Sequence, residues 1–223
     1  MTSTIKIGST EVGSGHPTYI VGEIGINHNG SLDVAIELIE SAAAAGADCA
    51  KFQMRNMEAL YRNSGNQNDI QEDVPTQYIL DLLSRFQLSN NEMYDAFDHC
   101  KKTGILPICT PWDLPSVDAL EQYGMSAHKT SSADLTNHDL ISAVAETGKP
   151  MLVATGMATE IEIEETVALL DKLATDYVLL HSNATYPTPF KDINLRYMQR
   201  LKTIGNRPVG YSGHERGYHV PLA

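Results

Sequence analysis

The sequence is poor in cysteine, in long apolar runs and in basic residues. Its three cysteines, Cys49, Cys100 and Cys109, are an odd number and form no CxxC pair. This weighs against a disulfide framework and favours a reducing compartment. No stretch approaches the roughly 20 apolar residues of a membrane-spanning helix, and residues 1–17 contain no apolar signal-peptide core. We therefore expect a cytoplasmic protein without membrane association.

The deficit of basic residues narrows the range of partners. Lys and Arg total 16 against 28 Asp and Glu, which gives a net charge of -12 at pH 7. Nucleic-acid binding relies on clustered Lys and Arg side chains, so we expect no nucleic-acid partner. A small anionic substrate remains compatible with this charge, because a few lysines in one cleft outweigh the global charge locally.

What is present fits one sizeable domain. A chain of 223 residues with 42% hydrophobic residues can form most of an α/β barrel, which typically needs about 250 residues. Residues 1–17 alternate and then break at glycines, which predicts a short N-terminal hairpin or strand. Residues 18–223 are expected to form the barrel domain.

Strand-like and helix-like segments alternate along this second region. The expected strands lie at 18–25, 48–53, 105–111, 127–134, 150–156, 177–187 and 208–214. The expected helices lie at 31–46, 90–104, 114–124, 137–148, 162–174 and 193–205. Such alternation predicts a parallel sheet with helical crossovers, either a closed barrel or an open doubly wound sheet. The sequence has no GxGxxG or GxxxxGK[ST] motif, which favours the barrel.

Polar residues follow nearly every expected strand, as they do at the active-site face of a TIM barrel. One connection is unusually long: residues 54–89 exceed the usual length of such a loop. Its polar centre, NSGNQNDIQEDVP, predicts either a flap over the barrel mouth or a surface insertion without function.

Two lysines lie inside expected strands, although lysine is seldom buried unless it is paired. Lys51 and Lys129 are therefore candidates to clamp an anion or to form a Schiff base with a carbonyl substrate. The structural alternative is that a neighbouring carboxylate, such as Glu23 or Asp134, neutralises each lysine. The same two carboxylates are also candidates for acid/base work or hydroxyl binding.

Three histidines follow strands and are candidate metal ligands. His28, His181 and His214 are not linked by HxxxH spacing, so a packed histidine is the favoured interpretation for any one of them. His214 is the strongest candidate, because small residues surround it in the sequence GYSGHE.

Seven motifs in order resemble the sialic acid synthase family. They are EIGINHNG (23–30), DCAKFQ (48–53), KTSSADLTN (129–137), GKPMLVATGMAT (148–159), LLHSNATYPTP (179–189), DINLR (192–196) and GYSGHE (210–215). This family includes N-acetylneuraminate synthases and the enzymes for legionaminic, pseudaminic and spore-coat sugars. The resemblance implies a TIM barrel that condenses phosphoenolpyruvate with an N-acetylmannosamine-type sugar and releases phosphate.

The resemblance also implies a divalent metal, Mn²⁺ or Mg²⁺, and a set of site residues. The implied catalytic residues are Glu23, Lys51 and Lys129. The implied substrate-binding residues are Gln53, Ser132, Asp134, Asn183, Tyr186 and Ser212, and the implied metal ligand is His214. The resemblance assigns Lys51 and Lys129 to anion binding. It therefore makes a Schiff-base role for either lysine the less favoured interpretation.

The sequence departs from the family pattern in three places. Ala184 occupies the slot where the family has asparagine before Tyr186, so Asn183 is expected to supply that contact from one position earlier. Asp134 stands where a longer Glu is common. Family members also continue with an eighth strand, a second metal histidine and an antifreeze-like domain, so the chain is expected to be a barrel truncated before strand eight.

This length leaves three functions open. The leading one is the synthase, which the resemblance implies to be a homodimer when full length. The alternatives are a Schiff-base aldolase using Lys129 and a catalytically inactive barrel that binds a phosphorylated metabolite or a partner.

Overall fold

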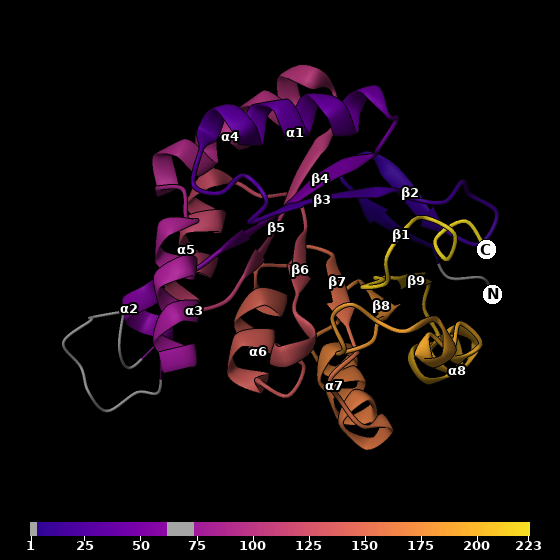
Figure 1. The fold of residues 1–223 in the computed structure, drawn as a ribbon. Coiled ribbons are helices and arrows are strands. Elements are labelled where there is room, and N and C mark those ends of the chain that lie inside the picture. Colours follow the sequence, from indigo (N-terminus) through magenta and orange to yellow (C-terminus); the bar gives the residue numbers. More distant parts are fainter. Residues whose placement is uncertain (1–3, 62–73) are drawn as a thin grey trace. The chain divides into compact units, whose positions relative to one another are not determined.

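The computed structural model describes residues 4–61 and 74–223. The chain divides into two compact units. The first unit is Tyr19–Met125, and the second unit combines Met1–Thr18 with Ser126–Ala223. Both units alternate strands with helices, which can be followed along the colour gradient of Figure 1.

In its described residues, the first unit has three parallel strands in the order β3–β4–β5. The strands are β3 (Val21–Gly25), β4 (Cys49–Met54) and β5 (Leu106–Pro111). The helices are α1 (Leu32–Ala44), α2 (Met57–Leu60), α3 (Val74–Arg85), α4 (Asn90–Thr103) and α5 (Leu114–Tyr123). Helices α1 and α4 pack against each other and against these strands (Figure 1), so β4 is buried along nearly its whole length.

Local sequence signals explain where these helices begin and end. Ser89 and Glu92 form a capping box at the start of α4, and Gly104 ends that helix in the left-handed conformation at φ 86°. Asp113 accepts a hydrogen bond from the backbone N–H of Ser116 at 2.8 Å. Asp113 is therefore the N-cap of α5, which gives this polar strand-end residue a structural role.

The core of the first unit is apolar and aromatic. Phe52 of β4 meets Phe97 of α4 edge-to-face with ring centroids 5.3 Å apart, and both rings are fully buried. Tyr94 stacks on Tyr123 at 5.2 Å on the flank of this cluster. Aromatic pairs of this geometry add to the free energy gained by burying their apolar surface.

The segment 54–89 is expected to be a long polar loop, but its described part includes the helices α2 and α3. The polar centre expected to be a flap or an insertion lies mostly at 62–73, outside the described residues. The sequence of helix α3 has apolar residues at helical spacing after a proline, which is a helix signal. The long polar stretch that precedes it in the sequence obscures this signal.

The second unit begins with the expected hairpin, β1 (Thr4–Ile7) paired antiparallel with β2 (Thr10–Gly13). Its parallel strands follow the order β6 (His128–Thr130), β7 (Met151–Ala154), β8 (Tyr177–His181) and β9 (Val209–Tyr211). Its helices are α6 (His138–Glu146), α7 (Glu160–Lys172) and α8 (Tyr197–Gly205), with 3-10 turns η1 (Ser132–Asp134) and η2 (Phe190–Asp192).

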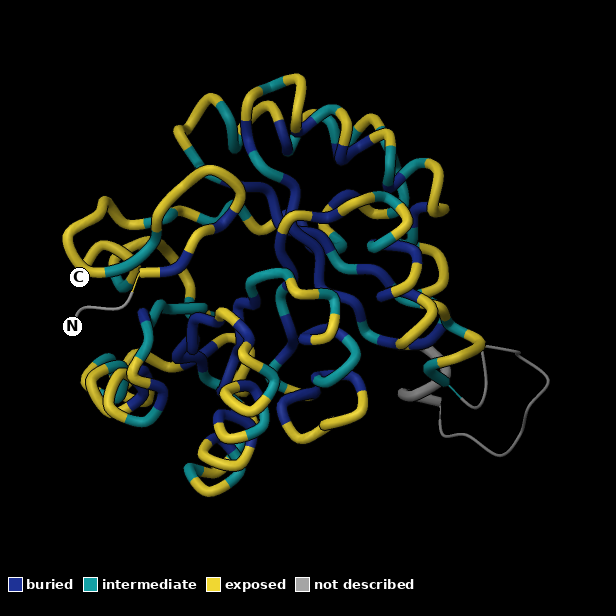
Figure 2. The backbone as a smooth tube through the Cα atoms, turned by 180° about the vertical axis from the view of Figure 1, so that it is seen from behind, coloured by how far each residue is buried: buried dark blue, intermediate teal, exposed yellow. Residues whose placement is uncertain are grey.

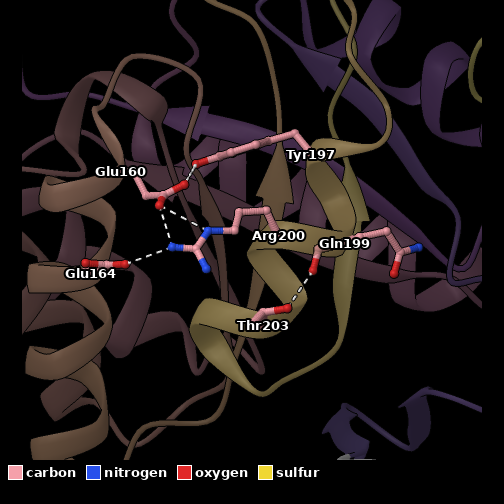
Figure 3. Close-up of polar contacts among 6 residues, drawn as sticks. All are labelled: Glu160, Glu164, Tyr197, Gln199, Arg200 and Thr203. Carbon is pink, nitrogen blue, oxygen red and sulfur yellow. Dashed lines mark hydrogen bonds and ion pairs between the residues drawn. The ribbon is translucent and has the colours of Figure 1, made fainter.

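A polar network joins α7 to α8 on the solvent side of the second unit (Figure 3). Arg200 donates from Nε to Oε1 of Glu160 at 3.0 Å and from Nη2 to Glu164 at 3.3 Å. The hydroxyl of Tyr197 donates to the other oxygen of Glu160 at 3.4 Å. Because these charges are exposed, water screens them and the network adds little to stability.

Burial follows the strands in both units. Figure 2 shows buried residues along the strands and exposed residues on the outer faces of the helices and in the loops. Among residues 4–61 and 74–223, no helix combines the length and the apolar character needed to cross a membrane.

Candidate active site

In the first unit, a buried lysine is paired with a carboxylate on the neighbouring strand. Glu23 of β3 lies opposite Lys51 of β4 in the parallel register. Lys51 Nζ is 2.6 Å from Glu23 Oε2, and the side chain of Lys51 is only 4% exposed against 51% for Glu23. Glu23 therefore neutralises Lys51, which is one of the interpretations that the sequence leaves open for this lysine. A buried ammonium needs such a partner, since an isolated one is costly to desolvate.

Gly25 makes room for this pair. The register of β3 against β4 shifts between Glu23 and Gly25, and Gly25 has φ +50°. A Cβ at Gly25 would lie 2.7 Å from Glu23 Oε1 and 3.4 Å from Gln53 Nε2. Glycine is thus required both by the backbone conformation and by the close approach of the carboxylate.

A cavity of about 280 Å³ adjoins Gln53 in the first unit. Its lining includes Gln53 and Arg55. Arg55 donates from Nη2 to Gln53 Oε1 at 2.6 Å and stacks over the Trp112 ring at 4.5 Å. Burial lowers the pKa of the Arg55 guanidinium. Arginine nevertheless stays protonated in proteins, so this cation acts here as a fixed donor.

His28, a candidate metal ligand from the sequence, is a packed histidine. Only 1% of it is exposed, and its Nδ1 accepts a hydrogen bond from the backbone N–H of Gly30 at 3.1 Å. Burial lowers its pKa, although a hydrogen bond with the backbone of Gly25 opposes this effect. The backbone N–H of Gly30 thus occupies the Nδ1 lone pair of this buried ring, which favours a packed histidine over a metal ligand.

In the second unit, Lys129 and Asp134 lie on β6 and on the turn η1 that follows it. Lys129 Nζ donates to the carbonyl of Thr130 at 3.5 Å. Asp134 accepts from the Ser131 hydroxyl at 2.7 Å and from the Asn137 amide at 3.5 Å, and only 9% of it is exposed. The Asp134 carboxylate is therefore satisfied by neutral donors from its own turn.

Ser132 belongs to a cluster of oxygen and nitrogen atoms that closes the ends of β7 and β8. Its hydroxyl lies 3.0 Å from that of Ser182 and accepts from the backbone N–H of Gly156 at 3.1 Å. A Cβ at Gly156 would come within 2.8 Å of the carbonyl carbon of Ser182. Only glycine lets these two loops approach so closely, and the result is a group of donors suited to an anion.

His214 is oriented as a metal ligand would be. Its Nδ1 lies 2.7 Å from the carbonyl oxygen of Asn183. Because a carbonyl only accepts, Nδ1 carries the proton and Nε2 keeps its lone pair, which is the arrangement typical of metal-bound histidine. Within the described ranges, no three His, Cys, Asp or Glu side chains form a cation site. The residues described thus supply one fitting ligand.

Asn183 and Tyr186 surround this histidine. The Asn183 side chain donates to the carbonyl of Asp192 at 3.1 Å and accepts from the N–H of Thr185 at 2.8 Å. Tyr186 is 81% exposed, and its ring centroid lies 4.9 Å from that of His214. The amide of Asn183 therefore holds its own loop, while the Tyr186 ring is open to solvent.

His181 and Ser212 lie at the ends of β8 and β9. His181 Nε2 donates to the carbonyl of Ile193 at 2.6 Å, and the ring packs between Tyr197 and Tyr211. The backbone N–H of Ser212 donates to the carbonyl of His181 at 2.8 Å. His181 is thus a packed histidine, and the ladder bond fixes the start of the loop that carries Ser212 and His214.

Comparison with known proteins decides the family. A family model described as the NeuB family matches residues 38–223. The chain belongs to the NeuB family. It is 40% identical over 219 residues to an uncharacterized protein of Methanocaldococcus jannaschii. It is 36% identical over 218 residues to an N,N'-diacetyllegionaminic acid synthase of Campylobacter jejuni.

The alignments with these two NeuB-type relatives cover 98% and 92% of this chain. The chain spans 61% and 63% of the length of the relatives. A solved N-acetylneuraminic acid (sialic acid) synthetase from Leptospira borgpetersenii, in complex with citrate, matches with a TM-score of 0.90 at 31% identity. That match covers 100% of this chain and 74% of the other.

The fold class predicted from the sequence is confirmed by this likeness. The βα repeats of the two units are of the TIM-barrel type, with seven parallel strands and a short N-terminal hairpin in the described residues. The predicted resemblance to sialic acid synthases is confirmed as membership of the NeuB family.

Sequence reasoning missed three residues that this NeuB chain places in its polar clusters. Ser182 and Gly156 contact Ser132, and Arg55 contacts Gln53. Their position in the sequence was a usable signal. Ser182 directly follows β8, and Gly156 lies two residues after the end of β7. Arg55 follows the KFQ motif by two positions, at the start of the segment in which the sequence predicts a long loop.

Proposed function

We propose that the protein condenses phosphoenolpyruvate with an N-acetylmannosamine-type sugar to form a nonulosonic acid and inorganic phosphate. Membership of the NeuB family and the likeness to two named synthases support this proposal. The observation that carries it is the buried Lys51 ammonium held by Glu23 at 2.6 Å beside Gln53. A lysine fixed in this way is a preorganised cation for an anionic substrate.

The reaction forms one carbon–carbon bond and breaks one carbon–oxygen bond. The enol carbon of phosphoenolpyruvate attacks the aldehyde carbon of the open-chain sugar, whose oxygen takes up a proton. Water adds to the cationic centre that develops at the phosphate-bearing carbon and loses a proton. Phosphate then leaves with the oxygen that joined it to that carbon, and the new hydroxyl loses its proton as the ketone forms. Phosphoenolpyruvate, sugar and water thus become the product and inorganic phosphate.

In the first unit, we assign Lys51 to the anion as a positive charge, and Glu23 to accepting a proton from the attacking water. Glu23 is half exposed, so water reaches its free oxygen. The Gln53 amide is assigned to the sugar. These roles rely on positioning and on fixed charge, which together account for large parts of enzymatic rate enhancement.

In the second unit, Lys129 and the Ser132 cluster are assigned to the phosphate and carboxylate of phosphoenolpyruvate. The Ser132 hydroxyl lies within hydrogen-bonding distance of both the Ser182 hydroxyl and the N–H of Gly156, so an anion bound beside it would meet several donors at once. Asp134 and Tyr186 are assigned to the sugar, and Ser212 to the phosphate. Asn183 positions His214 through its carbonyl oxygen.

NeuB family members generally use a divalent metal, and His214 Nε2 is the atom that would bind it here. When bound, Mn²⁺ or Mg²⁺ supplies a Lewis acid that polarises the sugar aldehyde.

The proposal is tested by measuring phosphate release from phosphoenolpyruvate by the full-length gene product with Mn²⁺. N-Acetylmannosamine and its 2,4-diacetamido analogue serve as acceptors, and mannose is the control that lacks the acetamido group. We expect release with an acetamido sugar and none without an acceptor. If no 2-acetamido sugar supports release, the proposal is wrong.

A further inference from the structure

Arg55 is held from two sides, although the proposed reaction gives it no role. Its Nη2 donates to Gln53 Oε1 at 2.6 Å, and its guanidinium lies 4.5 Å from the centre of the Trp112 ring. Tyr61 and the carboxylate of Asp113 both favour its charged form and oppose the burial that lowers its pKa. Gln53 lies two residues before Arg55 on β4, whereas Trp112 follows β5. The guanidinium is therefore fixed by two neighbouring strands of the first unit.

This contact determines which way the Gln53 amide faces. A guanidinium carries only donors, so the Gln53 atom that meets it must be the carbonyl oxygen. The amide nitrogen consequently lies on the opposite side. A Cβ at Gly25 would be 3.4 Å from Gln53 Nε2 and 2.7 Å from Glu23 Oε1, so the amide nitrogen faces the side on which Glu23 lies.

The cavity that adjoins Gln53 and Arg55 carries little charge on its lining. It measures about 280 Å³, and its lining includes Met54, Met57 and Met93 together with Gln53 and Arg55. Among the described residues that line it, Arg55 alone carries a full charge at neutral pH.

We propose that Arg55 is a positioning residue that holds Gln53 with its amide N–H groups toward the acceptor sugar. Gln53 then recognises a sugar oxygen that accepts a hydrogen bond, and it discriminates against a group that can only donate. This inference rests on the proposed function for the identity of the substrate. Arg55 itself acts only through Gln53.

The test compares Michaelis constants for the two substrates in the full-length gene product. Arg55→Met frees the Gln53 amide to rotate, and we expect the KM for N-acetylmannosamine to rise about tenfold, the equivalent of one lost hydrogen bond. The KM for phosphoenolpyruvate stays within about twofold, since Arg55 does not contact that substrate in the proposed assignment. Arg55→Lys keeps a donor opposite Gln53 and is expected to restore part of the sugar affinity.

A double-mutant cycle separates positioning from general damage. In a Gln53→Ala background, adding Arg55→Met should raise the KM for the sugar no further, because the residue through which Arg55 acts is gone. The matched control is Arg200→Met, which removes an arginine that also donates to side-chain oxygens but belongs to the exposed network of α7 and α8. Its two KM values should equal those of the wild type.

Three results would overturn the inference: an unchanged KM for the sugar in Arg55→Met, an equal rise in both KM values, or additive effects in the cycle. A wild-type protein that releases no phosphate would instead overturn the proposed function. The two failures are distinguishable, since the first requires an active wild-type enzyme.

Discussion

The two units hold their polar residues by different physical means. In the first unit, Lys51 is buried and paired with Glu23 at 2.6 Å, and Gln53 is held by the Arg55 guanidinium. In the second unit, Ser132 is held by the Ser182 hydroxyl and the N–H of Gly156, which are neutral groups. Charged groups hold the side chains of Lys51 and Gln53 in place, whereas the close approach of two loops holds Ser132 in place.

The two clusters are vulnerable to different kinds of substitution. An ion pair with one buried member fails asymmetrically, because removing the exposed partner leaves a charge without compensation. A cluster of neutral donors fails sterically, because its geometry depends on how closely the loops approach. Substitutions that change only charge or only side-chain volume therefore distinguish the two clusters.

The largest effect is expected at the ion pair of the first unit. Lys51→Met removes a fixed cation, and the rate of phosphate release should fall about 10²- to 10³-fold, as when a preorganised donor is lost. Its stability should change little, because methionine fills the site without a charge. Glu23→Gln, in contrast, leaves the Lys51 ammonium buried and unpaired, and should lower the free energy of unfolding by about 3 kcal/mol.

Steady-state kinetics and urea unfolding of both variants check this asymmetry. The comparison between the units would break if Lys51→Met were the more destabilising of the two. It would also break if Glu23→Gln were as stable as the wild type, because Lys51 would then not depend on its partner.

A second effect concerns the glycine next to this pair. Gly25 and Gly46 both have positive φ, +50° and +81°, but only at Gly25 would an added Cβ lie within 4 Å of Glu23. Alanine at either position should cost about 1–2 kcal/mol of stability for the left-handed backbone. Only Gly25→Ala should also displace Glu23, with about a tenfold loss of kcat/KM for phosphate release.

Thermal unfolding and kinetics of the two alanine variants separate strain from displacement. Equal losses of activity in Gly25→Ala and Gly46→Ala would show that the carboxylate position plays no part.

The third effect tests the steric cluster of the second unit. A Cβ at Gly156 would meet backbone of Ser182 within 2.8 Å, so Gly156→Ala must push the two loops apart. We expect the KM for phosphoenolpyruvate to rise about fivefold, because the separated loops weaken the hydrogen bonds to the anion without removing a donor. Gly148→Ala is the matched control, because Gly148 has φ +70° and no atom within 4 Å of a Cβ. It should lose stability and keep the wild-type KM.

The βα repeats could be predicted from the sequence because their signals are local. The capping box of Ser89 and Glu92 and the left-handed Gly104 lie within one helix, and both signals are present in the structure. Helix α3 was missed, since its apolar spacing follows a long polar stretch. The spacing of apolar residues over a short stretch therefore predicts the helices of the compact βα repeats better than a helix inside the long connection.

The sequence predicts which residues are candidates for the site, but it does not predict which of these side chains contact one another. The sequence predicts that Lys51 binds an anion or pairs with a carboxylate, but the register that places Glu23 opposite it is a property of the sheet. Ser182 lies 50 residues from Ser132 in the sequence, so no local pattern links them. Arg55 was missed because its partners, Gln53 and Trp112, meet only when β4 and β5 pair.

The smallest effect concerns the buried histidine of the first unit. Burial lowers the pKa of His28 in the folded protein, below the value near 6.5 of an unfolded chain. The unfolded state therefore binds more protons between the two pKa values, and the free energy of unfolding falls as pH drops through and below about 6.5.

His28→Asn keeps an acceptor for the Gly30 N–H and removes the titrating group. Urea unfolding at about pH 7.5 and pH 5.5 should give a smaller acid-side loss for His28→Asn than for the wild type. Equal losses would mean that solvent relieves the burial of this ring, and the first unit would then depend on charge only at Lys51 and Arg55.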